Sequence, residues 1–251
     1  MNDPFESMSA DARLDLARAK TKRILDHLTA LHQLQATNDL VVYSPMLSSQ
    51  IPVSRAAHAF NSFQDALHKF GVIRIAALWD KPSADRDSLP TVAALLSSAE
   101  VVTKAIDEVR IYHLNQAEPR RYSDQADDPI EQEFLSRYWQ EYCVRRSEQE
   151  AQSTRFWIRR SMWAISRVNK CSAALGIRRH RDNFIAHNLV HIDATDQKTA
   201  SRPMKYGDER KLLSVTTKIV RTLHLGVNGT SFDMAASMSL ADRRATELWE
   251  G

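Results

Sequence analysis

The segment from Ile130 to Lys170 constrains the fold most, because it contains neither proline nor glycine. Proline removes a backbone hydrogen-bond donor and glycine adds backbone freedom, so both disfavour helix interiors. Their absence predicts a long helix, which Pro129 can open because proline is well tolerated in the first turn. On length alone we expect one break in this helix, between Glu148 and Ser153.

The rest of the chain has the same helical character, with only 6 Gly and 8 Pro among 251 residues. Apolar spacing and capping residues predict further helices at 9–38, 53–79, 90–115, 208–225 and 231–249. Ser9 is the expected N-cap of the first, and Thr230 or Ser231 that of the last. We find no convincing strand, internal repeat or long linker. The sequence therefore predicts an all-α fold in one domain that spans residues 1–251.

Charge is segregated along the chain, although the net charge is only +3. Eight basic residues and no acidic residue lie between Arg155 and Arg181. If residues 160–181 form one helix, rotation by 100° per residue places five of the basic residues within roughly 80° of one another. They are Arg160, Arg167, Lys170, Arg178 and Arg181. This stripe is either an ordinary solvated face or a surface for nucleic acid, for which Arg160, Arg167, Lys170, Arg178 and Arg179 are the candidate RNA contacts.

The stripe leads into the run Arg181-Asp182-Asn183-Phe184-Ile185-Ala186-His187, in a helix expected to continue through Gly176 to about residue 189. An arginine can hold a phosphodiester, and a histidine can transfer a proton near neutral pH. This pairing suits RNA cleavage without a metal ion. Asp182 and Asn183 are candidate supporting residues, although both could make ordinary helix-surface contacts, and His187 alone would be typical of a helix edge.

Spacing within the motif predicts an incomplete site. Six residues of α-helix turn Arg181 and His187 about 120° away from each other. The reach of the arginine or a local bend could still bring both side chains to one phosphate. Alternatively, two copies related by a two-fold axis would bring two arginines and two histidines into one cleft. The two-fold arrangement is the simplest of these, so we expect a homodimer formed through the motif helix.

Several other kinds of site are not predicted. His180 and His191 share a helical face with His187, but no Glu or Cys joins them at metal-ligand spacing, so we expect neither a metal nor a cofactor. The sequence has no glycine-rich phosphate loop. Cys143 and Cys171 are expected to be reduced thiols. No apolar segment is long enough to cross a bilayer and no signal peptide is evident, so we expect a cytoplasmic protein without a membrane partner.

The motif region resembles a known family. The run from Arg178 to His187 is similar to the signature of HEPN domains, in which an arginine, a polar residue and a histidine mark the active helix. Two further stretches resemble the HEPN branch of type U abortive-infection systems of bacteria, and the resemblance covers about residues 60–230. One is Arg74 to Asp80 followed by Asp85 to Pro90, and the other is Tyr206 to Leu212 with Val227 to Gly229 after it.

This resemblance implies a helical bundle with flanking helices, dimerisation through the motif, and metal-independent endoribonuclease activity in a toxin or antiviral effector. Arg181 would bind the scissile phosphate, His187 would transfer a proton, and Asp182 would orient the site. RNA is the implied partner, and an antitoxin could restrain the activity. Some HEPN domains are instead inactive scaffolds or nucleotide binders. A non-catalytic module that binds RNA, a nucleotide or a protein is therefore the alternative for this chain.

Overall fold

A computed structural model describes residues 4–51, 55–115, 128–186, 204–205 and 207–249. Within these ranges the chain is helical and contains no strand, so the all-α prediction is confirmed. The helices are α1 Ala10–Tyr43, α2 Pro45–Gln50, α3 Arg55–Ala77, α4 Leu89–Leu95, α5 Ala99–Asn115, α6 Pro129–Asn169, α7 Ser172–His180, the π-helix η2 Arg181–Ala186, α8 Asp208–Asn228 and α9 Met234–Trp249.

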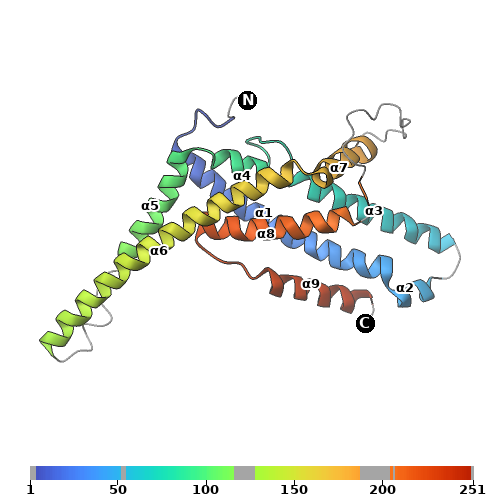
Figure 1. The fold of residues 1–251 in the computed structure, drawn as a ribbon. Helices are drawn as coiled ribbons and strands as arrows, with labels where there is room; N and C mark the ends of the chain where they lie inside the picture. The colour runs from blue at the N-terminus through green and yellow to red at the C-terminus, as the bar shows by residue number, and fades with distance from the viewer. Residues whose placement is uncertain (1–3, 52–54, 116–127, 187–203, 206, 250–251) are drawn as a thin grey trace.

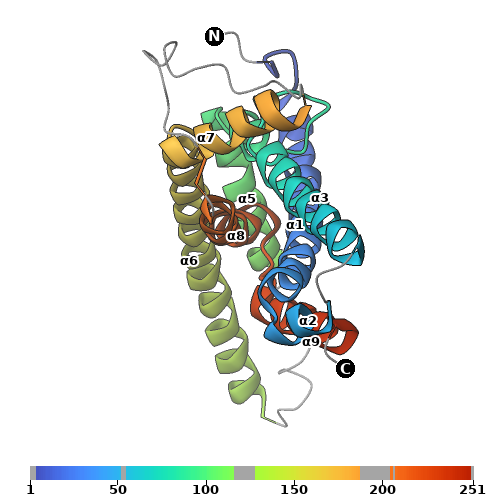
Figure 2. The same ribbon diagram turned by 90° about the vertical axis from the view of Figure 1, so that its right-hand side faces the viewer.

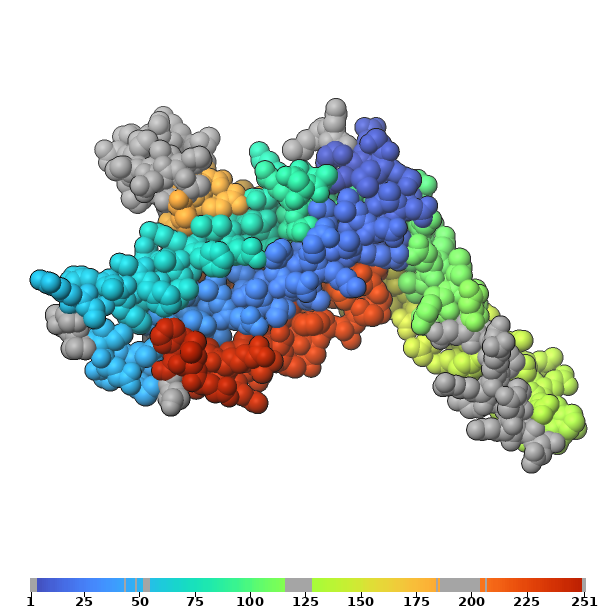
Figure 3. All heavy atoms as spheres, turned by 180° about the vertical axis from the view of Figure 1, so that it is seen from behind, coloured from blue at the N-terminus to red at the C-terminus, as the bar shows by residue number. Residues whose placement is uncertain are grey.

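The helices form an elongated bundle with one projecting hairpin (Figure 1). Helix α1 packs against α3, α8 and α9, while α6 packs against α5 and α8. The outer parts of α5 and α6 extend away from the bundle, and α9 lies along α1 on the opposite side (Figure 3). Helix α7 lies across one end of the bundle, next to the end of α3 (Figure 2).

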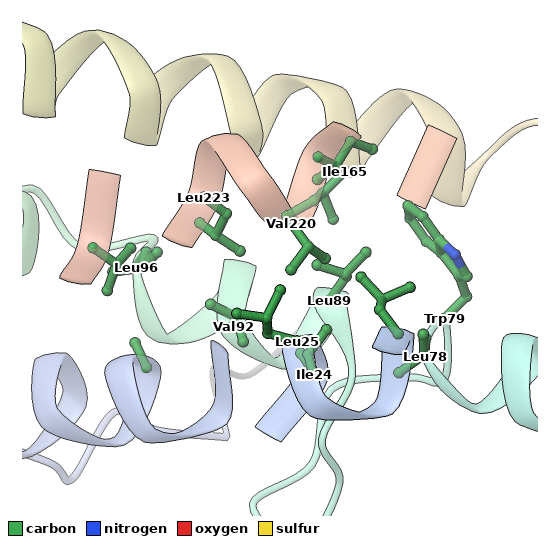
Figure 4. Close-up of a cluster of buried hydrophobic side chains, with 14 of the residues drawn as sticks. Ile24, Leu25, Leu78, Trp79, Leu89, Val92, Leu96, Ile165, Val220 and Leu223 are labelled. Atoms are coloured by element: carbon green, nitrogen blue, oxygen red, sulfur yellow. The ribbon is translucent and has the colours of Figure 1, made fainter. Parts of the chain in front are cut away.

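The core lies where α1, α3, α4, α6 and α8 meet (Figure 4). Ile24 from α1, Val92 from α4 and Val220 from α8 are fully buried there, as is Trp79 just after α3. Burying apolar surface of this kind is the main favourable contribution to folding. The core therefore joins segments that lie far apart in the sequence.

Local capping follows the sequence at several helix ends. The Ser9 hydroxyl accepts a hydrogen bond from the Ala12 backbone N–H at 3.3 Å, which confirms the predicted N-cap. Glycines with positive φ, Gly207 and Gly229, bound α8 at its two ends. The expected cap of the last helix is wrong: Asp233, not Thr230 or Ser231, accepts the Ala236 N–H, and the helix begins at Met234.

Three predicted boundaries also differ from the structure. The short helix α2 was not predicted, although Ser44 caps it and Pro45 opens it. The expected helix over 90–115 is two helices, α4 and α5, whose axes differ by 86°. The expected break between Glu148 and Ser153 is absent, because α6 continues through that region with Ala151 and Thr154 buried.

The helix breaks later, at Lys170 and Cys171. Cys171 has extended backbone angles, φ −73° and ψ 149°, and α7 starts at Ser172. Gly176 lies buried inside α7 and does not mark the break. The predicted single helix over 160–181 is therefore wrong, and so is the continuous basic stripe derived from it.

Within the described residues, no single helix is long and apolar enough to cross a bilayer. Helices α4 and α5 reach that length and composition only together, as a bent pair.

Close packing of α6 on α8 depends on Gly226. A Cβ atom there would lie 3.1 Å from the Ile158 backbone nitrogen and 3.1 Å from the Trp157 Cβ. In contrast, a Cβ on Gly71 would meet only the Leu34 and Asn38 side chains at 3.7 and 3.9 Å. We expect Gly226→Ala to lower the free energy of unfolding by about 1–2 kcal/mol, because a helix backbone cannot move aside cheaply. Gly71→Ala should raise it by up to about 1 kcal/mol. Urea unfolding that gives equal changes would contradict this packing.

A second prediction concerns pH. Thr217 donates its hydroxyl hydrogen to the Leu213 carbonyl at 2.8 Å, so its oxygen accepts from His32 Nε2, also at 2.8 Å. Burial lowers the pKa of His32 below 6.5, and Asp242 only partly offsets this. Below about pH 6.5 the unfolded chain therefore binds more protons at His32 than the folded chain, and stability falls as pH falls.

We expect His32→Gln to reduce the loss of unfolding free energy between pH 7 and pH 5. Some slope should remain, because burial also lowers the pKa of His27. Urea unfolding at several pH values measures both slopes, and identical slopes for parent and variant would contradict the neutral, donating His32.

Candidate functional site

The motif begins in an unusual helical turn. Residues Arg181–Ala186 form the π-helix η2, directly after α7. Single π-turns are rare and occur frequently at functional sites. The expected divergence of Arg181 and His187 used the α-helical rotation of 100° per residue, whereas residues 181–186 are π-helical. His187 lies outside the described residues, so the predicted 120° stays a prediction.

Arg181 is held between two carboxylates. Its Nη1 donates to Asp80 Oδ1 at 2.7 Å, and its Nε donates to Asp182 Oδ1 at 2.8 Å. The side chains of Arg181 and Asp80 are 18% and 19% exposed, whereas Asp182 is 53% exposed. Asp80 is thus the more shielded partner, and it comes from a segment a hundred residues earlier in the chain.

These carboxylates stabilise the charge of Arg181. Partial burial lowers the pKa of its guanidinium, but the bonds to Asp182 and Asp80 raise it by more, so the pKa lies above its ordinary value. The carboxylates also fix the plane of the guanidinium, which has five N–H groups in a rigid fork. Arg181 can therefore present an oriented positive charge, although the two neighbouring negative charges weaken its attraction for a phosphate.

Arg178 fixes α7 in place. Its Nη1 donates to the Trp79 carbonyl at 2.7 Å and to Asn169 Oδ1 at 2.9 Å, and its Nη2 donates to the Asn169 carbonyl at 2.9 Å. Asn169 ends α6, where backbone carbonyls have no partner within the helix. Arg178 supplies a hydrogen-bond donor to the Asn169 carbonyl and so stabilises the break between α6 and α7. Burial lowers its pKa, but an arginine remains a cation at neutral pH.

Trp79 connects this arrangement to the core. Its indole Nε1 donates to the Thr216 hydroxyl of α8 at 2.9 Å, while its carbonyl accepts from Arg178. Because the ring is fully buried, the backbone that carries Asp80 is fixed relative to α8. Arg181 thus meets a carboxylate whose position is set by the core.

The stretches that resemble the family lie at such junctions. Asp87 accepts hydrogen bonds from Lys20 at 3.2 Å and from Arg23 at 2.8 and 3.0 Å, which fastens the segment before α4 to α1. Arg210, at the start of α8, pairs with Asp39 of α1. Gly229 ends α8. These residues organise helix ends at several places in the bundle.

The structure separates the predicted RNA contacts into two groups. Arg160, Arg167 and Lys170 are exposed on α6, and Arg179 is exposed on α7. Arg178 is instead committed to three internal bonds, so it acts first as a positioning residue. Contact with RNA by any of the five stays a prediction.

The supporting residues have different outcomes. Asp182 lies at the site, because it accepts a hydrogen bond from Arg181. Asn183 is half-buried, and its supporting role stays a prediction. Sequence reasoning missed Asp80 as a site residue. The available signal was its place at the end of a family-like stretch, directly after a tryptophan.

Among the described side chains, no group of three or more His, Cys, Asp or Glu residues is arranged to hold a metal ion. His191, one of the two histidines considered for that role, lies outside them.

The fold is all-α, and a short helix leads into the segment that begins with Arg181 and Asp182, the start of the HEPN-like pattern in the sequence. Residues 10–237 match the HEPN family described as AbiU2. The chain therefore belongs to the AbiU2 family of HEPN domains, and the match extends further towards both ends than the resemblance over residues 60–230. Comparisons with curated proteins and with solved structures gave no significant match.

The Asp80 contact can be tested by stability. We expect Asp80→Asn to lower the free energy of unfolding by about 1–2 kcal/mol, because it leaves the shielded charge of Arg181 with one fewer partner. Asp182→Asn is the matched control, and it should cost less than about 0.5 kcal/mol because Asp182 is more exposed. Urea unfolding measures both, and an equal loss in the two variants would contradict the assignment of Asp80 as the main anchor.

Proposed function

We propose that this protein is a metal-independent endoribonuclease that acts as a toxin or effector in bacterial antiviral defence by abortive infection. The observation that carries the proposal is the fixed, charged Arg181 at the head of the run that ends in His187. Membership of the AbiU2 family supports it. The proposed site is cytoplasmic, takes RNA, and requires no cofactor.

In the proposed reaction the RNA 2′-hydroxyl attacks the adjacent phosphorus atom. The new O2′–P bond replaces the P–O5′ bond, which leaves a 2′,3′-cyclic phosphate and a 5′-hydroxyl. His187 acts in proton transfer, either from the attacking hydroxyl or to the leaving oxygen. Arg181 stabilises the charge that develops on the phosphate, and Asp182 and Asn183 support the geometry. DNA lacks the attacking group and is not cut.

The site is proposed to be shared between two subunits. Arg181 has two carboxylate partners, so further positive charge is needed around a bound phosphate. A homodimer through the motif segment would supply a second Arg181 and a second His187 to the same cleft. An antitoxin that covers this face would restrain the activity.

The rival function is a non-catalytic module that binds RNA, a nucleotide or an acidic protein. One observation favours it: the exposed arginines of α6 lie apart from the Arg181 site and need no proton transfer to hold a phosphate. In that case RNA binding would fall with salt concentration and would be unaffected by His187→Ala.

Cleavage of mixed RNA in EDTA tests the proposal. We expect the parent protein to cut RNA and to leave cyclic phosphate ends, and His187→Ala and Arg181→Ala each to lose at least about a hundredfold in rate. His58→Ala and Arg244→Ala are matched controls, since both residues are exposed and lie outside the motif. They should cut as the parent does.

Two results would overturn the assignment. One is intact RNA with the parent protein, and the other is full activity in the His187→Ala and Arg181→Ala variants. Loss of cleavage on adding EDTA would refute the metal-independent mechanism. A strict monomer in solution that cuts RNA would refute the shared site.

A further inference from the structure

Helix α6 presents aromatic rings and arginines in alternation. Phe156, Arg160, Trp163 and Arg167 follow one another at intervals of four, three and four residues. At 100° per residue they fall within about 60° of one another. The buried Ile158 and Ile165 lie on the opposite side of the helix. We call the four exposed side chains the aromatic–arginine face.

The rings on this face are open to solvent. Phe156 is 51% exposed and Trp163 is 64% exposed. Each carries a guanidinium above it: the Cζ atom of Arg160 lies 5.8 Å from the Phe156 ring centre, and that of Arg167 lies 5.3 Å from the Trp163 ring centre. Large exposed aromatic surface is unfavourable in water and commonly marks a binding site.

The surrounding charge selects the partner. Arg159 and Lys170 are exposed and project within about 60° of Phe156, and no acidic residue lies between Arg155 and Arg181. The nearest acidic residues on α6, Glu150 and Glu148, lie about 9 and 12 Å before Phe156 along the helix, at 1.5 Å per residue. Glu148 pairs with Arg110, and Glu150 pairs with Arg146. A second copy of this face would bring arginines against arginines without compensating acids. A polyanion with flat apolar groups fits better.

We propose that the aromatic–arginine face binds single-stranded RNA, with bases stacked on Phe156 and Trp163 and phosphates held by Arg160 and Arg167. The face is about 16 Å long from Phe156 to Arg167, room for a few nucleotides. Single strands suit it because their bases are free to stack, whereas duplex RNA hides them. The proposal deepens the ribonuclease function proposed above and rests on it for the choice of RNA.

This face complements the Arg181 site. Two carboxylates flank Arg181, so that site orients a phosphate better than it attracts one. The end of α6 adjoins α7, and the motif begins directly after α7 (Figure 1). Strand affinity would then come from α6, and chemistry from the motif beyond α7.

Fluorescence anisotropy with a short, labelled single-stranded RNA tests the proposal, in a His187→Ala background so that the probe stays intact. We expect Trp163→Ala to weaken binding about tenfold, since one stacked base is lost, and Trp163→Phe to retain most of the affinity. Phe134→Ala is the matched control, because Phe134 is 67% exposed on the same helix but outside the basic segment. Its binding should equal that of the His187→Ala parent.

Binding that is unchanged by Trp163→Ala, absent in the parent, or stronger for duplex RNA would overturn the proposal. So would a Trp163→Ala variant that dissociates into smaller assemblies in solution while its RNA affinity stays constant, because the face would then be a subunit contact. The two proposals fail separately. Cleavage that survives Trp163→Ala together with unchanged affinity refutes only the stacking face, whereas Trp163-dependent binding by a protein that never cuts RNA refutes only the ribonuclease.

Discussion

The arrangement of the motif depends on the hydrogen bond from Arg178 to the Trp79 carbonyl. Trp79 is anchored through its ring to α8, and Arg178 also closes the end of α6 at Asn169. The Arg178 guanidinium thus joins α7 to the end of α6 and to the segment after α3. Because this junction fixes α7, it also sets where the π-turn begins and where Arg181 meets Asp80.

The arginines of this basic segment have different environments. Arg178 bonds to the backbone and stabilises the helix junction, and Arg181 is oriented by two carboxylates. Arg160 and Arg167 lie over exposed aromatic rings on α6. A single uniform stripe would have attracted RNA without orienting it. The break at Lys170 and Cys171 separates the proposed strand-binding surface from the proposed catalytic site.

Features that depend on local chemistry were predictable from the sequence. Ser9 caps the first helix as expected, and the scarcity of glycine and proline did indicate an all-α fold. The break at Lys170 and Cys171 was not predictable, because no glycine or proline marks it and Arg178 stabilises it from a distance. The continuity of α6 past Glu148 was missed because the break was expected on length alone, whereas packing on α5 and α8 supports the long helix.

The candidate site divides in the same way. Arg181 and Asp182 could be chosen from the motif, and their mutual bond is local. Asp80 ends a family-like stretch of the sequence, but only the tertiary fold shows that it meets Arg181. Only part of the aromatic–arginine face was predicted from the sequence. Its arginines belong to the predicted basic stripe, whereas Phe156 and Trp163 were not predicted as surface residues and are exposed in the structure.

The most direct measurement is a crystal structure of the protein with a short RNA whose cleavable position carries 2′-deoxyribose. Our account predicts a phosphate within hydrogen-bond distance of Arg181, with Arg181 still bonded to Asp80 and with His187 of one subunit or the other at the same phosphate. A strand bound away from Arg181, or a phosphate at Arg181 without any His187 near it, would contradict the account.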